Sequence, residues 1–154
     1  MPDSLLGLLA AGIALAVAVP LGLLWRARNG RMREVSPPAP SAGPVSDDAV
    51  APELLAELGV RVGVPATLLQ FSSAFCAPCR ATRQLCGEVA AQLDGVRHVE
   101  VDAEEHLDAV RALGVLRTPT LFVIDSGGRV VRRASGQPTR AQLLAAVAPL
   151  LEAR

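Results

Sequence analysis

The sequence predicts an α/β fold, a mixed central β-sheet flanked by helices and preceded by one N-terminal transmembrane helix. Three observations lead to this prediction. Residues 5–25 carry no charge, residues 34–52 are rich in proline, and residues 53–154 alternate apolar runs typical of strands with segments of helical spacing. The 154-residue chain therefore divides into an anchor with a basic flank (1–33), a tether (34–52) and one domain (53–154).

The segment from Leu5 to Trp25 is a candidate membrane span. At the helical rise it is about 31 Å long, close to the roughly 30 Å hydrocarbon core of a bilayer. Every basic residue near the span follows it: Arg26, Arg28, Arg31 and Arg33. The positive-inside tendency therefore predicts a single-pass protein of the cell membrane whose domain faces the cytoplasm, with an extracytoplasmic domain as the alternative. A cleaved secretory signal is disfavoured, because its basic residues would precede the apolar run.

The tether of residues 34–52 contains five prolines with serine, alanine and glycine between them. This composition favours a semi-extended spacer that holds the domain off the membrane, and a proline-recognition ligand is the weaker alternative. The formal net charge of the chain is zero, so there is no reason to expect nucleic acid as a partner.

Within residues 53–154 the expected order of elements is αβαβαββα. In order, we expect a helix at Glu53–Leu58, a strand at Ala66–Ser72, a helix at Ala77–Leu93, a strand at Val96–Val101, a helix from Asp102 to about Gly114, strands at Thr120–Ile124 and Arg129–Arg133, and a final helix carrying Leu143, Leu144, Val147 and Leu150.

Local signals mark the ends of several of these elements. Residues Asp102–Glu105 and Thr139–Gln142 have the spacing of capping boxes, which open helices. Residues Asp125–Gly128 are typical of a hairpin turn. Strands joined through helices are normally parallel, whereas a hairpin adds an antiparallel strand, so the sheet is expected to be mixed.

The motif Cys76-Ala77-Pro78-Cys79 lies between a predicted strand and the predicted helix that follows it. Two cysteines separated by two residues at the start of a helix can cycle between dithiol and disulfide. Cys76 falls at the N-terminal end, where free amides and the helix dipole favour a thiolate, so it is the predicted nucleophile. Cys79 lies three residues on, deeper in the same helical face, and is the predicted resolving thiol that attacks the mixed disulfide.

Four patterns together resemble the thioredoxin family over about residues 53–153. They are Phe75-Cys-Ala-Pro-Cys-Arg80 after a hydrophobic strand, Val99-Glu-Val-Asp102 in the next strand, Thr118-Pro119-Thr120 at the start of the third, and Gly127, Gly128 and Gly136 around the hairpin. The resemblance is to a membrane-anchored, bacterial-type member and implies protein-disulfide oxidoreductase activity. It also implies that Pro119 is cis and lies against the sulfurs, where Thr118 pairs its backbone with an extended substrate. A proline beside an apolar strand cannot donate to the ladder, which agrees with a special role.

The resemblance implies a set of residues that contact substrate: Phe75, Ala77, Pro78, Thr118, Pro119 and Gly136. Phe75 stands where typical members have tryptophan, which keeps an apolar lid. Gln70 stands where the family often has a buried acid that helps to deprotonate the resolving thiol, and an amide cannot accept a proton in that role. His98 aligns near the family lysine that accompanies this acid. Gln70 and His98 are therefore the candidate proton-relay residues, with a half-exposed structural histidine as the alternative for His98.

The sequence gives less support to other roles for these two cysteines. Zinc needs four ligands, and no second cysteine knuckle exists to join this one, so no metal is expected. Haem attachment would require histidine after the second cysteine, where Arg80 stands. No cofactor is therefore expected beyond the redox-active Cys76–Cys79 disulfide, with a purely structural disulfide as the remaining alternative.

For several nearby residues, the sequence favours a structural role over a functional one. Cys86 patterns with core residues, which favours a small buried hydrophobe over a second resolving thiol. Arg80 and Arg83 are read as solvated charge rather than as groups that lower the pKa of Cys76. The acidic run from Glu100 to Asp108 is read as helix capping and solvated surface.

The sequence therefore predicts a membrane-tethered thiol-disulfide oxidoreductase. Reduction is the favoured direction, because proline between the cysteines accompanies reducing behaviour in the family. The expected partners are protein or small-molecule disulfides and an electron-donating thiol system. The alternatives are an extracytoplasmic exchange protein for cytochrome maturation or disulfide formation, a redox sensor, and a non-enzymatic docking module whose thiols are incidental.

Overall fold

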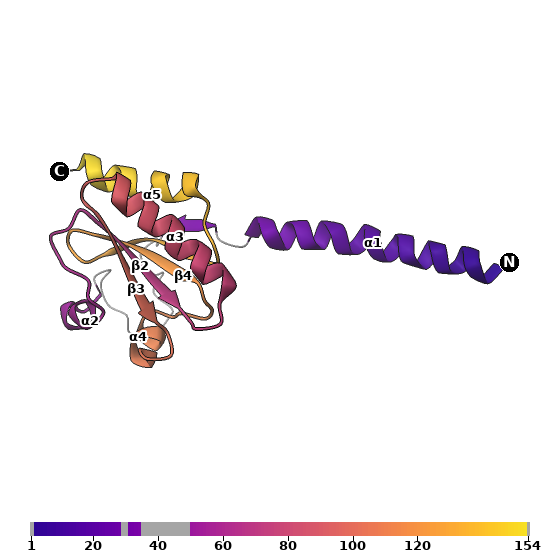
Figure 1. Ribbon diagram of the computed structural model, residues 1–154, viewed down its shortest axis with the longest axis horizontal. Coiled ribbons are helices and arrows are strands. Elements are labelled where there is room, and N and C mark those ends of the chain that lie inside the picture. The colour runs from indigo at the N-terminus through magenta and orange to yellow at the C-terminus, as the bar shows by residue number, and fades with distance from the viewer. Residues whose placement is uncertain (1, 29–30, 35–49, 154) are drawn as a thin grey trace, which may run out of the picture.

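The computed structural model describes residues 2–28, 31–34 and 50–153 (Figure 1). Most of the predicted tether, residues 35–49, lies outside the described residues. Helix α1 (Pro2–Arg28) contains the candidate membrane span. Its segment Gly7–Leu24 has a mean hydropathy of 2.3, and none of it is buried against the rest of the chain. By length and composition this helix can cross a bilayer, although a signal sequence would share both properties.

A five-stranded mixed sheet forms the centre of the domain. Its strands are β1 (Met32–Glu34), β2 (Ala66–Ser72), β3 (Val96–Asp102), β4 (Thr120–Asp125) and β5 (Val130–Ser135). Their order across the sheet is β1-β5-β4-β2-β3. Strands β2 and β3 are parallel, and every other neighbouring pair is antiparallel. The predicted mixed sheet is thus confirmed, and the helix between β2 and β3 is the crossover that parallel strands require.

Helices cover both faces of this sheet (Figure 1). They are α2 (Pro52–Glu57), α3 (Ala77–Gln92), α4 (Leu107–Ala112) and α5 (Arg140–Glu152). Helices α3 and α5 pack on one face through a core that includes Leu68 and Val89, and α2 and α4 pack on the other through one that includes Leu69 and Phe71. Successive residues of β2 therefore point to opposite faces, and both faces are apolar. This explains why the run Ala66–Ser72 is apolar throughout and buried at every position.

One of the two predicted capping boxes is confirmed and the other is wrong. The Thr139 side chain and Gln142 cap each other's backbone amides at the start of α5, as predicted. Asp102 instead ends β3, and its carboxylate accepts a hydrogen bond from the backbone N–H of Glu104 at 2.8 Å. This is a turn that aspartate forms two residues ahead of itself, and it competes with capping. Helix α4 consequently begins only at Leu107, with no side-chain cap at His106.

Strand β1 departs from the sequence prediction. Residues Met32–Glu34, assigned by sequence to the basic flank and the start of the tether, pair antiparallel with β5. Glu34 forms an ion pair with Arg132 of β5, and Met32 packs against the core beneath α3 and α5. Three residues, two of them charged, carry no periodic signal. The strand exists because β5 offers a partner, and it ties the chain beyond α1 to the edge of the sheet.

Candidate active site

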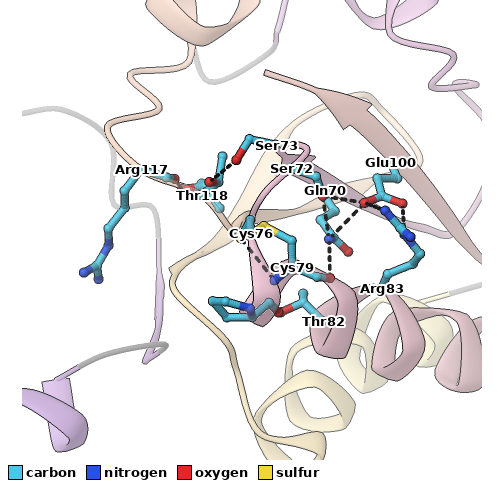
Figure 2. The surroundings of a disulfide bond; sticks show 12 residues. Gln70, Ser72, Ser73, Cys76, Cys79, Thr82, Arg83, Glu100, Arg117 and Thr118 are labelled. Atoms are coloured by element: carbon cyan, nitrogen blue, oxygen red, sulfur yellow. Dashed lines mark hydrogen bonds and ion pairs between the residues drawn. A yellow bond between two sulfur atoms is a disulfide. The ribbon is translucent and has the colours of Figure 1, made fainter. Parts of the chain in front are cut away.

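Cys76 and Cys79 form a disulfide at the N-terminus of α3 (Figure 2). Cys76 is the N-cap residue of α3, and its Sγ accepts a hydrogen bond from the backbone N–H of Cys79 at 3.2 Å. Ala77 and Pro78 occupy the first two helical positions, where the missing N–H of proline costs nothing. Cys76 is half-exposed, whereas Cys79 is only 1% exposed. The two sulfurs therefore differ in access in the way that the predicted roles require.

The loop before β4 lies beside the disulfide. The Thr118–Pro119 peptide bond is cis, the geometry that the resemblance implied for Pro119. The hydroxyl groups of Ser73 and Thr118 lie 3.0 Å apart, which links this loop to the turn before α3 (Figure 2). Gly136 donates its backbone N–H to the Pro119 carbonyl at 2.7 Å, which ties the start of β4 to the end of β5. Residues far apart in sequence thus meet around the two sulfurs.

Two large apolar side chains next to the site are exposed to solvent. Phe75 is 100% exposed, so the expected apolar lid is not folded over the disulfide. Leu116, two residues before Thr118, is 92% exposed. Sequence reasoning missed Leu116, since one leucine in an apolar stretch carries no sign of exposure. Such exposed apolar groups are typical of surfaces that contact partners.

Gln70 and His98, the two candidate relay residues, contact each other. The Nε2 of Gln70 donates to the Cys79 carbonyl at 3.0 Å and to Ser72 Oγ at 2.8 Å (Figure 2). Its Oε1 lies 3.2 Å from Nε2 of His98. Burial lowers the pKa of His98 and outweighs the opposing charge of Glu100, which favours the neutral ring. Gln70 therefore holds the main chain of Cys79, which an amide can do without accepting a proton.

Glu100 belongs to the site, although the sequence analysis read it as solvated surface. It lies opposite Gln70 in the pairing of β2 with β3. Its carboxylate accepts hydrogen bonds from Ser72 Oγ and from Nε and Nη2 of Arg83 (Figure 2). Arg83, predicted to be solvated charge, is thus an ion-pair partner. The signal that could have found Glu100 is strand register, which depends on pairing between distant segments.

Beside these groups lies a polar cavity of about 210 Å³. Its lining comes from the ends of β2 and β3, from the turn after β2 and from the first two turns of α3. The lining residues are Ser72, Ser73, Ala74, Cys76, Cys79, Arg80, Arg83, Glu100 and Asp102. Both sulfur-bearing residues therefore border a space that is rich in hydrogen-bonding groups. In the part of the chain that the structure describes, no three His, Cys, Asp or Glu side chains are grouped to hold a metal ion.

Comparison with known families agrees with this geometry. The family model "Thioredoxin" matches residues 60–149, more than half of the chain. The chain belongs to the thioredoxin family. No curated protein matches it.

Solved thioredoxins share the fold at low sequence identity. The thioredoxin of Trypanosoma brucei brucei is 19% identical with a TM-score of 0.55, over 75% of this chain and 99% of that one. A mutant thioredoxin of Halobacterium salinarum NRC-1 is 20% identical with a TM-score of 0.55, over 71% and 96%. Oxidised mitochondrial thioredoxin 3 of Saccharomyces cerevisiae is 18% identical with a TM-score of 0.52, over 63% and 87%. At these identities the likeness establishes the fold.

The Glu100 carboxylate should make this thioredoxin domain sensitive to acid. Burial alone raises its pKa, but hydrogen bonds from Arg83 and Ser72 outweigh burial and lower it from the usual 4.5. A carboxylate whose pKa is lower in the folded state stabilises the fold above pH 4.5, and this contribution is lost as the pH falls through the folded-state pKa. The free energy of unfolding, measured with urea between pH 3 and 7, should therefore fall more steeply toward low pH for the native chain than for Glu100→Gln.

The matched control for this experiment is Glu88→Gln, because Glu88 pairs with Arg140 where both side chains are exposed. Its stability should follow the native pH curve closely, since exposed ion pairs contribute little. Parallel curves for the native chain and Glu100→Gln would show that the hydrogen bonds from Arg83 and Ser72 do not hold the carboxylate ionised.

Cys86 should remain unreactive in the folded thioredoxin domain. Its side chain is fully buried in the core beneath α3, as the sequence predicted. Burial, and secondarily the charge of Glu100, raises the pKa of its thiol to about 12. After mild reduction at pH 7 to 8, iodoacetamide should label Cys76 readily and leave Cys86 unmodified until urea is added. Peptide mass spectrometry measures this, and early labelling of Cys86 would contradict the packing.

Proposed function

We propose that this protein is a membrane-tethered protein-disulfide reductase in which Cys76 attacks and Cys79 resolves. The observation that carries the proposal is the difference between the two sulfurs. Cys76 is accessible at a helix N-terminus and accepts the Cys79 N–H, whereas Cys79 is buried behind it. A free N–H and the helix dipole lower the pKa of a thiol, so Cys76 is the group best placed to react as a thiolate.

The proposed reaction begins with the dithiol form. The Cys76 thiolate attacks one sulfur of a substrate disulfide, which forms a mixed disulfide and releases one substrate thiolate that takes up a proton. Cys79 then loses its proton, and its sulfur attacks Cys76 Sγ. This step forms the Cys76–Cys79 disulfide and releases the second substrate thiol, so two electrons have passed to the substrate. A dithiol or low-molecular-weight thiol donor restores the reduced form by the reverse exchange.

The surroundings of the sulfurs support a role for each neighbouring residue. Thr118 presents its backbone beside the disulfide, where an extended substrate segment can pair with it as an added strand. The exposed Phe75 and Leu116 offer apolar contact near the site, and Gly136 holds the loop of Pro119 in place. The exposed Ala77 and Pro78 keep the approach to Cys76 free of bulky groups.

We assign Gln70 a positioning role and place proton release elsewhere. Gln70 fixes the carbonyl of Cys79, and His98 contacts Gln70. The proton of Cys79 leaves through the polar cavity, which Cys79 borders together with Ser72 and Glu100. Hydrogen-bonding groups along this path replace the buried acid that the sequence lacks at position 70.

Two experiments test this function. Reduction of insulin by dithiothreitol should be accelerated by the full chain in liposomes, and no acceleration would refute the reductase.

C-terminal fusions test the side of the membrane, because alkaline phosphatase folds into an active form only where its disulfides persist. A cytoplasmic domain predicts low phosphatase activity, whereas strong activity would place the domain outside and favour an extracytoplasmic exchange role.

A further inference from the structure

The anchor helix joins the domain at the same end of the sheet as the disulfide. Strand β5 runs toward that end, where Ser135 lies opposite Thr120. Strand β1 runs the other way and begins at Met32, which lies opposite Ala134. The chain before Met32 therefore leaves the sheet at the end where Pro119 and Cys76 stand. This placement follows from strand register alone.

Chain geometry limits how far the anchor can lie from the site. Met32, Ala134, Leu121 and Gln70 form one row across the sheet. Three strand spacings of about 4.8 Å put Met32 roughly 15 Å from Gln70, which contacts Cys79. From Arg28, the last residue of α1, four Cα steps of about 3.8 Å reach Met32, so the helix ends at most about 15 Å from the sheet. Because β1 is fixed to β5, residues 35–49 do not lengthen this connection.

The exposed apolar residues of the domain are most prominent at the same end. Phe75 and Leu116 are the two most exposed large apolar side chains among residues 50–153, and they lie directly before Cys76 and two residues before Thr118. Arg80 and Arg117 are exposed beside them. Exposed apolar groups suit the interface of a bilayer. The exposed acids Glu104, Glu105 and Asp108, which follow β3 at the same end, offset the arginines, so the apolar groups carry this argument. Val62, near Gly128 at the opposite end of the sheet, is the next most exposed large apolar residue among residues 50–153.

We propose that the disulfide end of the domain faces the bilayer, and that the substrates are disulfides in membrane proteins, in segments close to the surface of that bilayer. The proposal rests on the tether and the reductase activity proposed above. The proline-rich segment therefore does not act as the spacer expected from the sequence. The connection that sets the distance between the domain and the membrane is the short one before β1. The chemistry is unchanged: each substrate disulfide accepts two electrons and two protons, and Cys76–Cys79 becomes oxidised.

Fluorescence quenching tests the orientation without using the redox reaction. In full chains that carry Trp25→Phe, one tryptophan is introduced at Phe75→Trp and, as the matched control, at Val62→Trp. Liposomes contain zwitterionic lipids and lipids with nitroxide-labelled headgroups. The probe at position 75 should be quenched at least about twofold more than the probe at position 62, because only the former lies at the end where the anchor enters. Equal quenching, or stronger quenching at position 62, would overturn the orientation.

Two synthetic substrates test the substrate class. Each is a single membrane-spanning peptide with one disulfide, placed either about five or about thirty residues from its span. In shared liposomes the native chain should reduce the near disulfide at least about fivefold faster than the far one, since the short connection raises its effective concentration there. Inserting about twenty Gly and Ser residues directly after Arg28 should abolish this preference. The same insertion within residues 35–49 should preserve it, because β1 stays in place.

The outcomes separate this inference from the proposed function. Equal rates on the two peptides, or a preference lost through the insertion within residues 35–49, would overturn membrane-proximal selection even where insulin is still reduced. Failure to reduce either peptide or insulin would refute the reductase, and the quenching result would still decide the orientation. A chain that reduces insulin faster than the near peptide would show that soluble proteins are the substrates.

Discussion

Replacing Cys76 with serine should lower the rate of insulin reduction by at least about 10³-fold, to the uncatalysed background. A serine hydroxyl is not ionised near neutral pH and cannot form the mixed disulfide, so both steps of the exchange are lost. Cys86→Ser is the matched control, because Cys86 is buried away from the disulfide and should not take part. Insulin turbidity measures the rates, and a Cys76→Ser chain with near-native activity would refute the assignment.

The partner substitution Cys79→Ser should give a different defect. The Cys76 thiolate still attacks, but nothing resolves the product, so substrate stays covalently bound as a mixed disulfide. Non-reducing gels should show this adduct for Cys79→Ser and not for Cys76→Ser. A docking module with incidental thiols predicts no adduct in either case and partner binding that survives both substitutions.

Phe71→Ala should be the most destabilising change in the core. Phe71 is fully buried, and its ring meets that of Phe122 edge to face with centroids 5.9 Å apart. Truncating a buried phenylalanine costs about 3–5 kcal/mol, against a total of about 5–15 kcal/mol for a typical domain. The urea midpoint of the full chain in detergent should fall sharply and be measurable by far-UV circular dichroism.

Phe75→Ala provides the matched control, since it removes the same atoms from a residue that is 100% exposed. Its free energy of unfolding should change by no more than about 0.5 kcal/mol, because surface substitutions rarely do more. Similar losses from the two substitutions would mean that Phe75 packs against the domain rather than facing solvent.

Much of the domain could be predicted from sequence because its signals are local. The apolar run Ala66–Ser72 and the motif around Cys76 define β2 and the start of α3, and the structure places both as expected. The capping box of α5 is similarly self-contained, because Thr139 and Gln142 satisfy each other within one turn. A local pattern succeeds when the groups that complete it lie nearby in the chain.

The failures share the opposite cause. Strand β1 and the role of Glu100 both depend on strand pairing, which brings together residues about 30 to 100 positions apart. Asp102 has the spacing of a capping box, but it pairs within the sheet as the last residue of β3. Gln70 departs from the family pattern in a way that the sequence shows, yet its hydrogen bond to the Cys79 carbonyl depends on how α3 packs over β2.

A redox titration of the Cys76–Cys79 pair in the full chain tests the central claim most directly. Thiol labelling at defined ratios of reduced to oxidised dithiothreitol gives the fraction of the pair that is reduced. A reductase predicts a reversible two-electron transition, about 30 mV per tenfold change, with a midpoint near the roughly −270 mV of thioredoxins. A midpoint below about −300 mV would indicate a structural disulfide, and one near −120 mV would indicate an oxidant. Either result would contradict the account.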